Sequence, residues 1–202
     1  MSRSPRPHGW TGLTACALLL WHPPLVSAHL VTTGMGPVYD GIGHLVVSPE
    51  DLVPALALAC YAGLRGAPAS RRAMFLLPLA WLVGGLAGSV LHVAGSLPIA
   101  AASFLILGGL VAADLSVPSA MVAGITIALG LSHGVLNGIA LREGAGMLGL
   151  IGIASVLFVL VSLTSAVVVS LRQPWARVAV RVAGSWMAAT GLLMVGWALR
   201  QG

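Results

Sequence analysis

The residues best suited to bind a cation lie in a few short clusters of an otherwise apolar chain. The 202 residues include only five acids and six His. Glu50 and Asp51 are adjacent and follow His44 closely, whereas His133 and Asn137 are four residues apart and share one face of a helix. Imidazole is a ligand for nickel, copper, zinc and related metals, and carboxylates add hard oxygen ligands. These residues therefore predict a site for a divalent transition metal.

The first 28 residues have the layout of an export signal. Two Arg precede an apolar stretch over 13–21, and small residues lead up to Ala28. That stretch is well short of the roughly 20 apolar residues that cross a bilayer. We therefore predict a cleavable signal over 1–28 and a single transmembrane helical domain over 29–202. A retained first helix, or a lipoprotein anchored at Cys16, is the alternative.

Two further His residues extend the predicted metal site. Cleavage after Ala28 makes His29 the N-terminal residue, and its amine and imidazole together chelate a divalent metal. His92 falls near the end of an apolar segment on the expected outer side of the membrane. The structural alternatives are a flexible terminal residue for His29 and an interfacial residue for His92.

Composition predicts a membrane protein. Hydrophobic residues make up 58% of the chain and charged residues only 7%, with a mean hydropathy of +0.99, whereas a soluble domain carries about 25% charged residues. All ten basic residues are Arg, and they stand singly or in pairs between apolar runs. This arrangement is typical of membrane loops and excludes a nucleic-acid-binding surface.

The apolar segments predict an all-α polytopic bundle of about six transmembrane helices. The expected spans are 52–64, 73–95, 98–113, 118–141, 147–171 and 178–199. Ser48 and Pro49 are typical of a helix start, and the segment 42–47 before them is predicted to be amphipathic or re-entrant. A backbone break at membrane depth is tolerated only inside protein or beside a polar cavity. The first span is therefore the first place to look for a site.

The distribution of Arg predicts the orientation. With the mature N-terminus in the periplasm, six Arg lie on the cytoplasmic side and two lie outside. The six are Arg65, Arg71, Arg72, Arg172, Arg177 and Arg181, and the two are Arg142 and Arg200. We expect a multi-pass protein of a bacterial inner membrane.

Two motifs carry a resemblance to a known family. The stretch Gly41–Leu45 with Ser48–Leu52 resembles the HupE/UreJ membrane proteins, and Gly130–Gly134 resembles that family's later His-Gly motif. Members are associated with nickel or cobalt uptake that serves hydrogenase and urease. The resemblance implies a similar role for His44 and His133.

The chain departs from the family pattern at two places. Glu50 and Asp51 stand where the family has Asp-His, and Asn137 stands where some members have a second His. Both changes make the site richer in oxygen ligands. They argue against specificity for nickel alone, leave iron, manganese, zinc, cobalt and copper open, and also allow a variant that no longer transports.

The leading functional hypothesis is a permease or channel for a divalent transition metal, which is its substrate, with no tightly bound cofactor. The predicted metal residues are His29, His44, Glu50, Asp51, His92, His133 and Asn137. The alternative is an accessory protein that delivers metal to a metalloenzyme or scaffolds a respiratory complex. Expected partners are the lipid bilayer, the metal ion and either further copies of the chain or a metalloenzyme.

An enzyme is not expected from the motifs. The sequence contains no His-Glu-x-x-His motif and no P-loop. Ser132 and His133 are adjacent, so on a helix their side chains point in different directions and do not form a catalytic pair by themselves.

Overall fold

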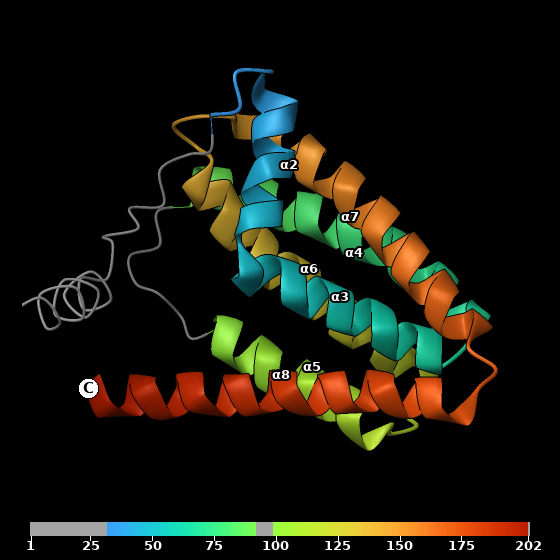
Figure 1. Cartoon of the computed structure of the whole chain (residues 1–202). Coiled ribbons are helices and arrows are strands. Elements are labelled where there is room, and N and C mark those ends of the chain that lie inside the picture. The colour runs from blue at the N-terminus through green and yellow to red at the C-terminus, as the bar shows by residue number, and fades with distance from the viewer. Residues whose placement is uncertain (1–31, 92–98, 202) are drawn as a thin grey trace, which may run out of the picture.

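The computed structural model describes residues 32–91 and 99–201, and over those residues its regular structure is entirely helical (Figure 1). The helices are α2 (Pro37–Val47), α3 (Pro49–Leu64), α4 (Ala67–Val90), α5 (Ile99–Ala113), α6 (Ser119–Ala140), α7 (Gly146–Ser170) and α8 (Pro174–Gln201). The predicted all-α class is confirmed. The predicted signal over 1–28 lies outside the described residues.

The described helices include several that can span a membrane. α4, α6, α7 and α8 are each long and apolar enough, and α2 and α3 meet the same criterion as one bent pair. α5 is apolar but shorter. Four to five long candidate spans and one short helix thus stand where six spans were expected. Large apolar side chains such as Phe75 and Leu163 lie exposed on the outside, as lipid contact requires. The chain is a multi-pass helical membrane protein.

The first span is broken, as the sequence predicted. α2 and α3 are bent by 78° at Ser48. Pro49 begins α3, where its missing N–H costs nothing, and Ser48 occupies the N-cap position. The predicted helix start is confirmed, although the Ser48 side chain makes no capping hydrogen bond. The break places Glu50 and Asp51 in the first turn of α3, where acids are favoured by the helix dipole.

α4 and α6 approach so closely that their backbones touch. A Cβ added to Gly88 would lie 2.1 Å from the carbonyl oxygen of Val135, and one added to Gly134 would lie 2.3 Å from that of Trp81. Only glycine fits at such positions, and small residues four apart are a common device for packing transmembrane helices. The contact fixes the position of α6 relative to α4.

α8 packs chiefly on α5 and lies along one side of the bundle (Figure 1). This contact also depends on glycine, because a Cβ added to Gly108 would lie 2.4 Å from the backbone nitrogen of Ala188. Much of the rest of α8 is exposed, including Trp175, Trp186 and Trp197. The α5–α8 pair reaches the rest of the bundle mainly through α3.

An ion-pair cluster joins three helix ends. Arg65, which follows α3, pairs with Asp114, which follows α5, and Arg177 at the start of α8 lies 3.8 Å from the same carboxylate. Nearby, the Tyr61 hydroxyl donates a hydrogen bond of 2.7 Å to the Leu115 carbonyl oxygen. These three ends therefore meet at one end of the bundle, in agreement with the predicted placement of Arg65 and Arg177 on the same side of the membrane. The assignment of that end to the cytoplasm stays a prediction.

Candidate functional site

Three of the predicted site residues meet inside the bundle. Asp51 Oδ1 lies 2.7 Å from His133 Nδ1, and Asp51 Oδ2 accepts a hydrogen bond of 2.7 Å from Asn137 Nδ2. Asp51 is 5% exposed, His133 1% and Asn137 2%. Ionisable groups at this depth are retained only when they are paired and hydrogen-bonded. The three side chains, here called the polar cluster, join α3 to α6.

Local sequence explains how the polar cluster is built. The break at Ser48 sets Asp51 in the first turn of α3, so that its carboxylate enters the bundle at a helix end. On α6, His133 and Asn137 share one face, as their spacing predicted, and Asn137 Nδ2 also donates to the His133 carbonyl oxygen at 3.0 Å. The close packing at Gly134 holds that face in place.

His133 has a second partner that the sequence analysis did not identify. Ser103 Oγ on α5 lies 2.9 Å from His133 Nε2. The Asp51 carboxylate also accepts from Asn137, so we assign it as the acceptor from Nδ1–H of His133. In that neutral tautomer Nε2 accepts from the Ser103 hydroxyl. The signal for Ser103 was present, since it is the only polar side chain in the apolar helix Ile99–Ala113.

Two buried polar atoms beside the polar cluster have no hydrogen-bond partner. The Trp81 ring packs against the His133 ring with centroids 5.4 Å apart, and its Nε1 is unpaired. Asn137 Oδ1 is also unpaired. A buried polar atom without a partner costs free energy, so such atoms call for an explanation. The Trp81 Nε1–H remains free to donate a hydrogen bond to a bound group, and Asn137 Oδ1 remains free to accept a hydrogen bond or to coordinate a cation.

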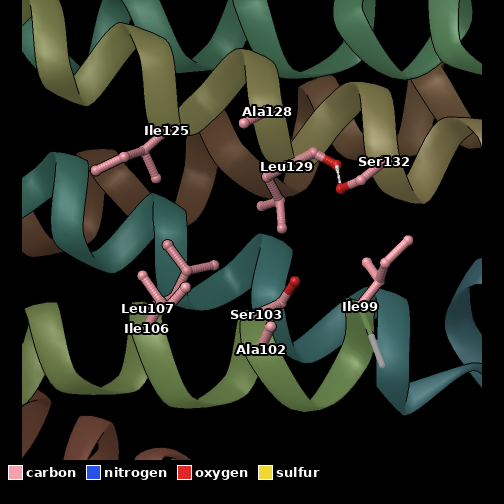
Figure 2. Close-up of a pocket in the computed structure, with 9 residues that line it drawn as sticks. All are labelled: Ile99, Ala102, Ser103, Ile106, Leu107, Ile125, Ala128, Leu129 and Ser132. Carbon is pink, nitrogen blue, oxygen red and sulfur yellow. Dashed lines mark hydrogen bonds between the residues drawn. The ribbon is translucent and has the colours of Figure 1, made fainter. Parts of the chain in front are cut away.

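A cavity of about 340 Å³ lies between α5 and α6 on the Ser103 side of the polar cluster (Figure 2). Ser103 and Ser132 are its polar lining residues, and the rest of its wall is Ile, Leu and Ala. Ile106 in that wall is 56% exposed, so the cavity opens on the outside of the bundle. Ser132 donates to the Leu129 carbonyl oxygen at 3.1 Å and not to His133, in agreement with the expectation that the adjacent pair is not catalytic.

The other predicted site residues lie apart from the polar cluster. His44 on α2 is half-buried and Glu50 is exposed, and neither side chain makes a hydrogen bond or ion pair with another described residue. Asp40, one turn before His44, accepts hydrogen bonds from the backbone N–H and the hydroxyl of Thr33 at 2.6 and 2.7 Å. His29 and His92 lie outside the described residues. The predicted role of His44 in metal binding stays a prediction.

Across residues 32–91 and 99–201, no three His, Cys, Asp or Glu side chains stand close enough to hold a metal among themselves. Asp51 and His133 supply two such groups. Any metal held here would need oxygen ligands from Ser103, Asn137, the backbone or water.

The geometry supports two kinds of chemistry at His133 Nε2. A carboxylate bonded to one imidazole nitrogen fixes the tautomer and the orientation of the ring, so that the other nitrogen presents its lone pair. The same arrangement serves a metal ligand and a general base.

Comparison with known proteins identifies the family of the chain. No match was found among curated proteins or among solved structures. The family model described as HupE / UreJ protein matches residues 17–194, most of the 202-residue chain. The chain therefore belongs to the HupE/UreJ family, as the resemblance of its motifs predicted.

Proposed function

We propose that the protein is a permease or channel for a divalent transition metal, with nickel and cobalt as the leading substrates. Its membership of the HupE/UreJ family supports a role in metal transport or metal delivery. The observation that favours transport is the buried pair of Asp51 and His133, which lie on different helices in the interior of the bundle. Ionisable residues inside a membrane domain commonly mark an ion pathway.

Within this proposal, His133 supplies the nitrogen ligand and Asp51 orients it. Nε2 faces away from the carboxylate, and its only partner among the described residues is the Ser103 hydroxyl. A metal that arrives at Nε2 displaces one neutral hydrogen bond, whereas the Asp51 bond to Nδ1 is retained. The unpaired Asn137 Oδ1 offers an oxygen on the same side of α6. Asp51 is therefore a positioning residue more than a direct ligand.

The proposed route begins near the break between α2 and α3. Glu50 is exposed in the first turn of α3, directly before the buried Asp51. An exposed carboxylate at this position attracts cations toward the buried pair. If the protein lies in a bacterial inner membrane with its N-terminus in the periplasm, the proposed route opens to the periplasm. His29, His44 and His92 then lie on that same side.

Metal accumulation tests the proposal. Cells that express the wild type, His44→Ala or His133→Gln are exposed to nickel, cobalt, copper, iron, zinc and manganese, and the cell-associated metal is measured by elemental mass spectrometry. Glu143→Gln is the matched control, because Glu143 is exposed in the α6–α7 connection and takes no part in the hydrogen bonds of the polar cluster. All values are normalised to the amount of protein in the membrane.

We expect one metal to rise with the wild type and with Glu143→Gln, and to stay at the background level with His133→Gln. A rise of the same size in His133→Gln would rule out the proposed role of the buried pair. If no metal responds to the wild type, the transport proposal is wrong.

The second candidate function is that of an accessory protein that delivers metal to a metalloenzyme. One observation favours it, since the described residues contain no group of three His, Cys, Asp or Glu. A delivery protein binds metal without changing total uptake. Unchanged accumulation together with reduced activity of a nickel enzyme in cells that lack the protein would support this second function.

A further inference from the structure

We infer that Ser103, His133 and Asp51 form a nucleophile–base–carboxylate triad that accepts an acyl group from a lipid-like ester bound in the cavity between α5 and α6. The inference goes beyond metal transport and does not depend on it. It rests on two hydrogen bonds, the burial of the base and the position of the serine on the cavity wall.

The distances meet the requirements for an activated serine. A nucleophile and its base must lie within about 2.6–3.2 Å, with a third group orienting the base. Ser103 Oγ lies 2.9 Å from Nε2 of His133, and Asp51 Oδ1 lies 2.7 Å from Nδ1. These are the roles of serine, histidine and aspartate in hydrolases of unrelated folds, where the triad is recognised by geometry and not by order in the sequence.

The three residues come from three different helices, α5, α6 and α3. His133 is 1% exposed and Asp51 5%, whereas Ser103 is only half-buried and faces the cavity (Figure 2). A buried base behind an accessible nucleophile is the arrangement that acyl transfer needs. Asn137 Nδ2 donates a hydrogen bond to Asp51 Oδ2, and this bond holds the carboxylate in position.

The cavity indicates the class of substrate. Apart from Ser103 and Ser132 its wall is aliphatic, and it opens between two helices on the outer surface of the bundle. That surface faces lipid, so a ligand enters most directly from the bilayer. The volume of about 340 Å³ accommodates part of an acyl chain, with the carbonyl group beside Ser103.

The reaction is an acyl transfer that balances with water. Ser103 Oγ attacks the ester carbonyl carbon while its proton passes to His133 Nε2, and a carbon–oxygen bond forms. The alcohol leaves with that proton when the ester C–O bond breaks. A water molecule then attacks the acyl-serine, gives its proton to Nε2, and releases the carboxylic acid as the Ser103 hydroxyl is restored. Asp51 stays a carboxylate and stabilises the charged imidazole between the steps.

A second serine on the same wall provides an internal control. Ser132 lines the same cavity, but its hydroxyl donates to the Leu129 carbonyl oxygen and has no imidazole partner. A probe in the cavity therefore meets two serines, of which only Ser103 has a base.

The experiment treats the purified, folded protein, stripped of metal with a chelator, with a long-chain alkyl fluorophosphonate. This probe reacts with activated serines and mimics an acyl chain. Peptide mass spectrometry locates the adduct and measures its rate at both serines, in the wild type and in Ser103→Ala, Ser132→Ala and His133→Gln. Thermal unfolding checks that each variant is folded.

We expect an adduct on Ser103 that forms on the order of 10²-fold faster, or more, than any adduct on Ser132, because general-base assistance contributes about that much. It should persist in Ser132→Ala and disappear in His133→Gln. An absent adduct, equal labelling of the two serines, or unchanged labelling in folded His133→Gln would overturn the inference. The comparison of the two serines within the wild type decides the question even if a variant fails to fold. The readout involves no metal, so its failure leaves the accumulation test unaffected.

Discussion

The close contact of α6 with α4 at Gly134 can be tested with one added methyl group. In Gly134→Ala the new Cβ would lie 2.3 Å from the Trp81 carbonyl oxygen and 3.0 Å from the Gly85 nitrogen, whereas ordinary contact begins at 3.4 Å. Both neighbours are backbone atoms of α4, so no side chain can rotate away. The two helices must separate, and such overpacking costs about 1–3 kcal/mol.

The matched control for this change is Gly124→Ala on the same helix. A Cβ at Gly124 meets nothing within 4 Å. Both substitutions gain the same helix propensity, about 1 kcal/mol for replacing Gly with Ala. The difference between the two variants therefore isolates the cost of the close approach between α4 and α6.

The assay is the free energy of unfolding in mixed micelles as the fraction of denaturing detergent is raised. We expect Gly134→Ala to be less stable than Gly124→Ala by about 1–3 kcal/mol. If the two variants agree to within about 0.5 kcal/mol, the scatter of surface substitutions, the close contact does not exist in the folded protein and the reasoning is refuted.

Two further predictions use the same assay. Asp51→Ala leaves two buried donors without an acceptor and should lower the free energy of unfolding by about 2–5 kcal/mol. Glu50→Ala, at the neighbouring exposed position, is the control and should change it by less than about 0.5 kcal/mol. Equal effects of the two substitutions would contradict the hydrogen-bonded geometry of Asp51. Arg65→Gln removes the charge that pairs with Asp114 and should cost about 1.5–3 kcal/mol, because hydrogen bonds to charged groups contribute that much. Arg71→Gln, at an exposed position, is its control. An equal loss of stability in the control would show that positive charge at that end of the bundle, and not the ion pair with Asp114, stabilises the protein.

The features that depend on nearby residues were predictable. Ser48 and Pro49 interrupt an apolar segment, and the structure bends by 78° at that point. His133 and Asn137 are four apart and share a helix face, as periodicity required. Break, helical period and composition are local properties, so the sequence alone determined that the protein is a helical membrane protein with a broken first span. It also determined two of the three members of the polar cluster as neighbours.

The partners of His133 were decided by tertiary structure. Asp51 lies 82 residues away in sequence and Ser103 lies 30 away. Asp51 was a predicted metal residue because it is an acid in an apolar chain. Ser103 is marked only as the one hydroxyl in an apolar helix, which is a weak indication of a site. Which side chains meet depends on how α3, α5 and α6 pack, and that in turn depends on backbone contacts such as the one at Gly134. Helical periodicity sets the face of a helix on which a residue lies, but not the helix that this face meets. The sequence by itself therefore determined the membrane class, the break and the residue types of the site, whereas the packing of the helices alone decided that a carboxylate, an imidazole and a hydroxyl form one hydrogen-bonded line.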